Sequence, residues 1–414
     1  MKKILISTLL LSGVAAAAPL QLCPAGLVAS KDGAALIALG DESNPRLSLA
    51  ADPYIPGMTP ADAAATKALF EQFKAAGITM VVLPLPPGQF LYGNVQRESL
   101  KKSEAIYQKE VAAFADAGFK VINLLSVARE FEAQGKPFFA LRDHHWTPEA
   151  MQTVTQMVKG LVDASQVKID RTAQTKILLR QAGYNGSYAN VLEKKCGPQA
   201  YKPDSRTFFS LDINSGESLL GDTNTDTVVI GDSFGISLFG FPALVSDALK
   251  TPVIPGAVNG GGPIGGFTTY FSMLTPAAKP KLVIWVADQL HPNENNIREI
   301  SATVEGNLYP KATLEKPAAS TDSGVSTFKF TSAPKVRTYT RLSFSGPKIE
   351  TQPVTFHYSD GTKEERRFYR RQDAVLPTYN VSFFYAVPNG KTLVRVETTL
   401  PAGVTVDVQL HTYH

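Results

Sequence analysis

Two short motifs in the sequence contain residue types that can do acid–base and nucleophilic chemistry. The first is RDHHWTP, in which Asp143, His144 and His145 are consecutive. Histidine is the side chain most easily recruited for proton transfer near neutral pH. Alternate residues of an extended segment share a face, so we expect Asp143 and His145 to point one way and His144 the other. The Asp143–His145 pair is the first candidate for proton transfer.

The second motif, VVIGDSFG, places Ser233 on a tight turn between Gly231 and Gly235. A serine on such a turn exposes its hydroxyl, and nearby helix N–H groups can face a developing oxyanion. Serine needs a base, and the base needs a third group to orient it. The predicted roles are Ser233 as nucleophile, His145 as general base and then acid, and Asp143 as the group that orients His145.

Each motif alone is also compatible with other roles. GDS is common in turns, and Asp-x-His pairs also bind metals. A metal site through Asp143, His144 and His145 lacks a clear further ligand, so we predict no metal and no cofactor. We expect His144 to be structural or to face the substrate. Trp146 is expected to pack beneath the site, with stacking on a sugar as the alternative.

A glycine-rich stretch, AVNGGGPIGG (257–266), is a further candidate for the site. Glycines permit close backbone approach to a ligand. Asn259, Gly260 and Gly261 are therefore candidates for oxyanion or substrate contacts. The stretch lacks the Lys-Ser/Thr of a phosphate-binding loop. A plain surface loop fits the same residues.

The elements that must position these motifs alternate between helix-like and strand-like patterns. The expected helices are 60–76 (after a Thr59 cap), 103–119 and 148–163, and the expected strands are 78–87, 120–125, 137–142 and 281–287. Residues 226–249 repeat the plan as strand, turn and helix. Such alternation predicts an α/β domain with a mainly parallel sheet. Ligands of these sheets bind at the carboxyl ends of the strands, where we expect both motifs.

The pattern changes beyond this domain. Residues 311–325 are rich in Ala, Ser, Thr and Pro and predict a linker. Residues 326–414 contain short strand-like runs, with SDG and PNG as expected hairpin turns, and predict a small all-β sandwich. From Val325 onward the chain has twelve basic and seven acidic residues. The segment RRFYRR (366–371) makes Arg367, Tyr369 and Arg371 candidates for polysaccharide binding, and a charged edge strand is the alternative.

The amino-terminal residues predict export. Lys2 and Lys3 precede a short apolar run and small residues, the pattern of a signal peptide spanning residues 1–17. We expect a mature catalytic domain over 18–310, located in the periplasm or outside the cell, with no membrane-spanning segment. In an oxidising compartment Cys23 and Cys196 are expected to form a disulfide. The net charge of +4 gives no reason to expect a nucleic-acid partner.

The two motifs together resemble the SGNH, or GDSL, hydrolase-like superfamily. In most of its members the serine block comes before the Asp/His block, and here the order is reversed. That permuted order, with Asp143, His145 and Trp146 in one block and Ser233 in the other, resembles the alginate O-acetyltransferase family (AlgX and AlgJ) and related DHHW-motif proteins. The resemblance covers roughly residues 60–290, and the β module parallels the carbohydrate-binding domain of AlgX-type members.

The resemblance implies an SGNH-hydrolase-like fold and a polysaccharide O-acetyltransferase that works through an acetyl-Ser233 intermediate. A carbohydrate acetyl esterase would use the same site, and a non-catalytic glycan-binding scaffold is an alternative of another class. The implied partners are a polysaccharide acceptor and a membrane O-acyltransferase that supplies acetyl groups. The sequence leaves the oligomeric state open.

Overall fold

The computed structural model describes residues 30–31, 34–39, 46–51, 53, 55–92, 97–173, 175–197, 203–212, 226–271, 279–288, 294–309, 314–331, 337–347, 351–369 and 382–413. The expected signal segment, Cys23 and Arg371 lie outside them, as do the side chains of Cys196 and Tyr369. The cleavage site and the disulfide therefore stay predictions. Across the described residues, no helix has both the length and the apolar character needed to cross a membrane.

A five-stranded parallel sheet forms the centre of the larger domain, in the order β5-β4-β10-β8-β9. The strands are β5 (Lys120–Val121), β4 (Thr79–Leu85), β10 (Leu282–Asp288), β8 (Thr227–Gly231) and β9 (Val253–Ala257). Strand β8 is buried along its whole length, as expected for a parallel strand covered on both faces. Val229 packs into the core on one face, and Val228 and Ile230 pack into the core on the other.

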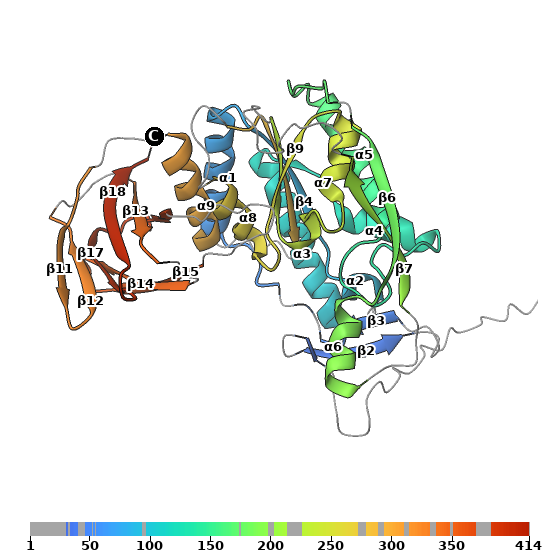
Figure 1. The fold of residues 1–414 in the computed structure, drawn as a ribbon, viewed down its shortest axis with the longest axis horizontal. Helices are drawn as coiled ribbons and strands as arrows, with labels where there is room; N and C mark the ends of the chain where they lie inside the picture. Colours follow the sequence, from blue (N-terminus) through green and yellow to red (C-terminus); the bar gives the residue numbers. More distant parts are fainter. Residues whose placement is uncertain are drawn as a thin grey trace, which may run out of the picture.

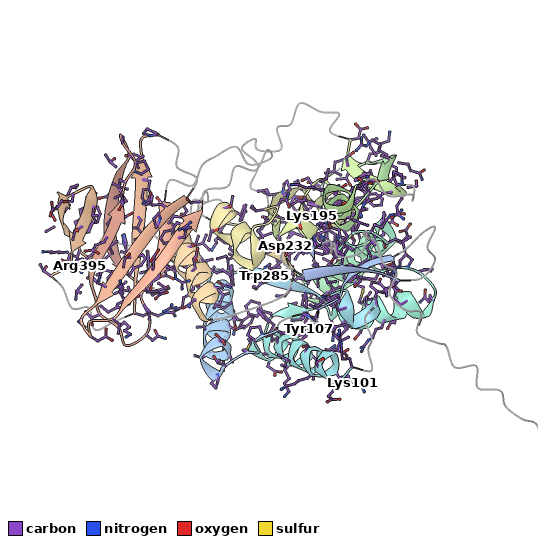
Figure 2. All side chains as sticks on the ribbon, turned by 90° about the horizontal axis from the view of Figure 1, so that it is seen from below. Lys101, Tyr107, Lys195, Asp232, Trp285 and Arg395 are labelled. Atoms are coloured by element: carbon purple, nitrogen blue, oxygen red, sulfur yellow. The ribbon has the colours of Figure 1, made fainter. Side chains whose placement is uncertain are left out.

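Helices cover both faces of this sheet (Figure 1). One layer consists of α4 (Leu124–Ala133), α5 (Pro148–Ala164) and α7 (Phe241–Leu249). The other consists of α1 (Pro60–Ala75), α3 (Glu98–Ala117), α8 (Gly262–Phe271) and α9 (Glu294–Leu308), while the short α2 (Gln89–Tyr92) follows β4. Trp285 of β10 faces this second layer of helices. Its side chain is fully buried, and its ring centroid lies 4.9 Å from that of Phe267 in α8. Figure 2 shows Trp285 in the interior of this domain.

The expected α/β class is confirmed, with two local corrections. The Thr59 side chain caps α1, and both expected first-turn prolines begin their helices, α1 and α5. The expected strand 120–125 is wrong beyond Val121, because the Asn123 side chain caps α4 by accepting from Leu125 N at 3.2 Å. The expected strand 137–142 is also wrong, since within the described residues it forms a single isolated bridge, between Phe139 and Trp146, and no strand.

Two smaller antiparallel units lie beside the sheet. Strands β1 (Ser30–Lys31), β2 (Ala34–Leu39) and β3 (Arg46–Leu49) pack against α6 (Ser187–Cys196), as Figure 1 shows. Strands β6 (Ile177–Tyr184) and β7 (Asp204–Leu211) form a two-stranded ribbon. Both units contact the motif that contains Asp143, as described below.

The carboxyl-terminal module is a β-sandwich. One sheet has the order β11-β12-β17-β14-β15 and the other β16-β13-β18. Their strands are β11 (Ala318–Asp322), β12 (Val325–Lys329), β13 (Thr338–Ser345), β14 (Thr351–Tyr358), β15 (Lys363–Tyr369), β16 (Ser382–Ala386), β17 (Leu393–Thr399) and β18 (Thr405–Thr412). The apolar faces of both sheets form one core. Arg395 lies on this module, far from Asp232 of the larger domain (Figure 2).

Two expectations about this module need correction. Residues 318–322 of the expected linker form the edge strand β11, which pairs with β12. The Ala, Ser and Thr residues of β11 are all exposed, and such a composition suits an edge strand as well as a linker. SDG joins β14 to β15 as a hairpin turn, but PNG joins β16 to β17, which belong to different sheets. The expected linker end at 325 is therefore wrong, because β11 already belongs to the module, while the boundaries at 17 and 310 stay predictions.

The two domains pack directly on each other through α9. Ala302 of α9 is buried in one cluster with Tyr339, Phe384 and Ala386 of the β module. A Cβ added at Gly306 would lie 2.1 Å from the Phe384 ring, so the helix approaches β16 as closely as a glycine permits. The module is thus held against α9 by a packed apolar contact.

Candidate active site

The segment with Asp143 lies in a closed loop between α4 and α5. The ends of the loop are held together by backbone hydrogen bonds from Ala140 N to His145 O at 3.0 Å and from Thr147 N to Phe138 O at 2.8 Å. The Thr147 hydroxyl then caps α5 by accepting from Ala150 N at 3.2 Å. The loop therefore fixes the motif directly at a helix start, although no sheet strand leads into it.

Ser233 lies where β8 ends, on a short 3-10 turn (η1, Ser233–Gly235). Asp232 holds the turn, since its carboxylate accepts from Phe234 N at 3.0 Å. Gly231 has φ +134°, and a Cβ there would lie 1.7 Å from the carbonyl oxygen of Val286 on the neighbouring strand. Only glycine fits this position, so the sharp turn that presents Ser233 depends on it.

The structure brings the three predicted residues into one hydrogen-bonded chain. His145 Nδ1 lies 2.9 Å from Asp143 Oδ2, and His145 Nε2 lies 2.9 Å from Ser233 Oγ. An ionised carboxylate only accepts, so Nδ1 carries the proton and Nε2 accepts from the serine hydroxyl. Burial opposes ionisation of Asp143, but hydrogen bonds from His144 and His145 outweigh it and hold the pKa of Asp143 well below its usual range. The arrangement can remove a proton from Ser233.

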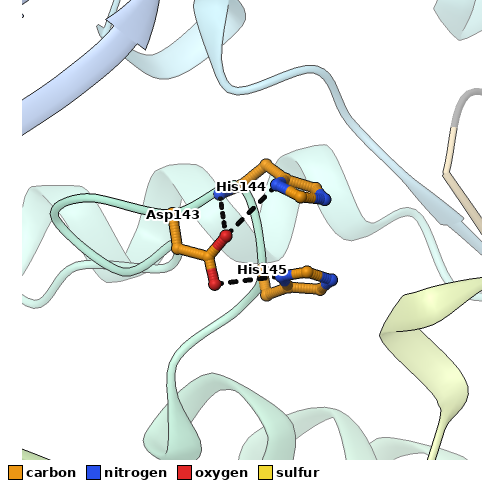
Figure 3. Close-up of side chains that lie close together, drawn as sticks. All are labelled: Asp143, His144 and His145. Carbon is orange, nitrogen blue, oxygen red and sulfur yellow. Dashed lines mark hydrogen bonds and ion pairs between the residues drawn. The ribbon is translucent and has the colours of Figure 1, made fainter. Parts of the chain in front are cut away.

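The two histidine rings lie side by side on the same side of Asp143, as Figure 3 shows. Their centroids are 4.0 Å apart. The expectation that they point to opposite faces is wrong, because residues 141–145 form a turn and bends and are not extended. His144 Nδ1 lies 2.6 Å from Ser187 Oγ and 3.1 Å from Asp143 Oδ1, so this ring is held by the same carboxylate.

Comparisons with known proteins identify related sequences and structures. The family model described as "SGNH hydrolase-like domain, acetyltransferase AlgX" matches residues 56–288, more than half of the chain. The chain belongs to this family. It is 25% identical over 249 residues to the alginate biosynthesis protein AlgX of Pseudomonas putida, covering 56% of this chain and 52% of that protein. It thus matches about half the length of that relative.

Two further relatives extend the comparison. The AlgX of Azotobacter vinelandii is 22% identical over 334 residues, covering 75% of this chain and 68% of that protein. The solved structure of Pseudomonas aeruginosa AlgX has a TM-score of 0.69 at 17% identity, covering 86% of this chain and 90% of that chain. This last likeness shows that the fold, including the β module, is shared.

Asp143, His144 and His145 form one group within the described residues that could hold a metal ion, since one potential ligand atom of each lies within 4.8 Å of the others. In this member of the AlgX family, however, the Asp143 and His145 atoms already bond to each other, and His145 Nε2 faces Ser233. An ion would have to replace those hydrogen bonds. The geometry favours proton transfer over metal binding. We therefore expect that a metal chelator leaves the activity unchanged.

Trp146 is fully buried, and its indole packs on Phe241 with ring centroids 4.8 Å apart. The packing role expected for it is the one that the structure supports, and the alternative of stacking on a sugar is not available to a buried ring. His145 is covered by aromatic rings, with Phe239 at 4.4 Å and Phe234 at 4.9 Å between centroids. This aromatic shell fixes the imidazole.

The glycine-rich stretch forms a strand end, a turn and the start of α8. Val258 N donates to Gly231 O at 2.9 Å, so the exposed Asn259 and Gly260 that follow lie at the same sheet edge as Ser233. The close approach expected of these glycines occurs against the protein itself, since a Cβ at Gly266 would lie 2.4 Å from Gly231 N. Asn259, Gly260 and Gly261 remain candidates for contacts with substrate.

Residues 366–369 of the RRFYRR segment lie on β15, next to the larger domain. Phe368 is buried in the sandwich core and Arg367 is exposed, because successive residues of a strand point to opposite faces. A cavity of about 390 Å³ opens between the domains, with Arg367 on one wall and Gly260 and Gly261 on the other. The role predicted for Tyr369 and Arg371 concerns side chains outside the described residues.

Three side chains that sequence reasoning missed surround Asp143. The Tyr184 hydroxyl donates to Asp143 Oδ2 at 2.5 Å, and the Ser187 hydroxyl donates to Oδ1 at 2.5 Å. Arg206 of β7 donates to Trp146 O at 2.8 Å. They come from the β6–β7 ribbon and the start of α6, which carry no motif that would have identified them.

Proposed function

We propose that the protein is an exported polysaccharide O-acetyltransferase that works through an acetyl-Ser233 intermediate. The observation that carries the proposal is the continuous chain Asp143–His145–Ser233, with both links at 2.9 Å, in a member of an acetyltransferase family. Periplasmic or extracellular location and removal of residues 1–17 are part of this proposal.

In the first half of the reaction, Ser233 Oγ attacks the carbonyl carbon of the donor's acetyl ester. His145 Nε2 takes the hydroxyl proton, and the new C–O bond gives a tetrahedral oxyanion. When the oxyanion collapses, the bond to the donor oxygen breaks, and His145 passes its proton to that leaving alcohol. The acetyl group is then an ester of Ser233.

In the second half, a sugar hydroxyl of the acceptor attacks the acetyl carbonyl. His145 removes its proton, and after collapse of the second oxyanion the same proton returns to Ser233 Oγ. The products are an acetylated sugar and free enzyme. Water in place of the sugar gives acetate, so the esterase alternative uses the same residues.

The Asn259–Gly261 turn is the proposed source of oxyanion and substrate contacts. Ala257 pairs with Gly231 in the β8–β9 ladder, and β9 contacts η1. This turn therefore follows the strand that neighbours the nucleophile turn. Preorganised donors at that place stabilise the oxyanion of both steps.

The acceptor is proposed to reach Ser233 along the cavity between the domains. Its two walls bring the Arg367 guanidinium of the β module opposite Gly260 and Gly261, which adjoin the nucleophile turn. A guanidinium suits the carboxylate of an acidic sugar and also the face of a neutral one. A membrane O-acyltransferase is the proposed source of acetyl groups.

The proposal is tested by trapping the acyl-enzyme. After incubation with p-nitrophenyl acetate and rapid acid quench, intact-mass spectrometry should show one acetyl group on the wild-type chain and none on Ser233→Ala. Ser237→Ala, an exposed serine four residues away, is the matched control and should be acetylated normally. Acetylation of the Ser233→Ala variant would remove the nucleophile assignment.

The products formed in the presence of an acceptor distinguish the transferase from the esterase and the glycan-binding scaffold. With donor and a panel of anionic and neutral oligosaccharides, a transferase yields acetylated sugar by mass spectrometry. Free acetate alone favours the esterase. Absence of acyl-enzyme with every donor favours the glycan-binding scaffold.

A further inference from the structure

The carboxylate of Asp143 has more hydrogen-bond donors than a triad requires. Besides His145, Oδ2 accepts from the Tyr184 hydroxyl at 2.5 Å. The other oxygen, Oδ1, accepts from Ser187 Oγ at 2.5 Å, Ser187 N at 3.2 Å and His144 N at 2.8 Å. Tyr184 is distinct among these, because it shares its acceptor atom with His145 Nδ1.

Tyr184 and Ser187 belong to one short segment that is fixed against the motif loop. Gly186 between them has φ +82°, and a Cβ there would lie 2.2 Å from the carbonyl oxygen of Arg142. That same carbonyl accepts from Tyr188 N at 3.1 Å. The segment therefore docks on the residue directly before Asp143, as closely as the backbone permits.

The Tyr184 ring is held independently of its hydroxyl. The ring packs edge-on against Phe208 and Phe239, and its centroid lies 6.0 Å from that of Phe208 and 6.1 Å from that of Phe239. The Arg206 guanidinium lies 5.0 Å from its centroid. Burial, reinforced by the Asp143 charge, raises the pKa of Tyr184 far above its usual value, so the hydroxyl stays a donor.

We propose that Tyr184 is a positioning residue of the reaction: its hydroxyl fixes Asp143 for His145 and limits how strongly His145 holds a proton. This rests on the proposed function of the triad. A hydrogen bond to Oδ2 draws negative charge away from the oxygen that stabilises the imidazolium. The imidazolium that forms when His145 takes a proton is then stabilised less.

The other charged or titratable groups around this pair come from three elements. His144 stacks on His145 from the same loop, Arg206 faces Tyr184 and Asp143 from β7, and Glu149 of α5 faces Arg206. Tyr184→Phe leaves all of them in place and keeps the ring packing. It removes one hydroxyl, so a change in the titration of His145 reports on that hydrogen bond.

The experiment is a titration of His145 in the full chain by NMR, with 13C in the histidine rings and His145→Ala to assign the signal. In Tyr184→Phe the midpoint should rise by about 0.5–1 pH unit, because a charge-assisted hydrogen bond is lost. The acid limb of kcat/KM for p-nitrophenyl acetate should move by the same amount. Ser187→Ala removes one hydroxyl donor from Oδ1 and leaves Oδ2 unchanged, so it should move the His145 midpoint less.

Tyr270→Phe is the matched control, because this buried tyrosine lies in the core on the other face of the sheet and its hydroxyl has no hydrogen-bond partner among the residues that the structure describes. It should leave the midpoint unchanged. An unchanged or lower midpoint in Tyr184→Phe, or an equal rise in the control, overturns the proposal. A purely structural role would lower kcat/KM at every pH without moving the midpoint. Because the NMR titration needs no turnover, failure of the proposed function is seen separately, as absence of Ser233 acetylation.

Discussion

Gly231→Ala tests whether the nucleophile turn depends on a close approach of two strands. Gly231 ends β8 opposite Val286 of β10 and has φ +134°. An added Cβ would lie 1.7 Å from Val286 O, whereas real Cβ atoms almost never come within 3.0 Å of another heavy atom. The two central strands must therefore separate by more than 1 Å at the place where Ser233 is presented.

Two costs add in this variant. The positive φ costs an alanine about 1–2 kcal/mol. The forced separation, like overpacking of a core, costs about 1–3 kcal/mol more. The free energy of unfolding should fall by about 2–5 kcal/mol. Native proteins have a total stability of about 5–15 kcal/mol, so the variant should still fold. Ser233 should move relative to His145, so turnover of p-nitrophenyl acetate should fall at least about tenfold.

Gly77→Ala is the matched control, because Gly77 has φ +73° and open space around its missing side chain. It carries only the cost of the positive φ, about 1–2 kcal/mol, and should keep full turnover. Urea unfolding followed by circular dichroism measures both variants. Equal losses of stability in the two variants would refute the close-approach argument. Normal turnover in Gly231→Ala would show that Ser233 does not depend on this glycine.

Three further predictions concern other buried groups. His145→Ala should lower kcat/KM for p-nitrophenyl acetate at least about a thousandfold, and His144→Ala much less; the reverse order would mean that His144 is the base. Trp146→Ala should lower the free energy of unfolding, measured in urea, by about 3–5 kcal/mol. Trp146→Phe should leave the KM for oligosaccharides unchanged, and a raised KM would restore the role of Trp146 in stacking on a sugar. Burial raises the pKa of Glu110 from 4.5 to about 7, so folding takes up a proton in that window and stability falls as pH rises through it. Glu110→Gln should therefore raise the urea midpoint at pH 8 and far less at pH 5, and equal effects at both would exclude this ionisation as the cause.

The proximity of Asp143, His145 and Ser233 could be predicted from the sequence because proton transfer to and from a serine restricts the residue types. The turn that presents Ser233 needs the glycine two residues before it, and the β8 pattern places that glycine at a strand end. The direction of His144 could not be predicted in the same way. Alternation applies to extended chains, whereas the loop turns at residues 141–145, which puts both imidazoles on one side.

The shell around Asp143 was missed for a different reason. Tyr184 and Ser187 lie about forty residues further along the chain, 41 and 44 positions from Asp143. Their ribbon and helix lie outside the central sheet, so no periodicity of the α/β pattern points to the site. The close packing of Gly186 on Arg142 helps to bring them there. Residues that act through tertiary contacts of this kind leave no local signal in one sequence.

The packing of the β module changes how it would serve an acceptor. A module on a free linker would act by raising the local concentration of polymer. Here α9 and β16 are in close apolar contact at Gly306 and Phe384, and the Arg298 guanidinium lies 3.8 Å from Glu364 of β15. Arg367, three residues beyond Glu364, is therefore carried on a strand that is held against the larger domain, and it lines the cavity together with Gly260 and Gly261. Under the proposed function, the module would contribute through orientation of the sugar at the acyl-enzyme, which favours one hydroxyl over its neighbours.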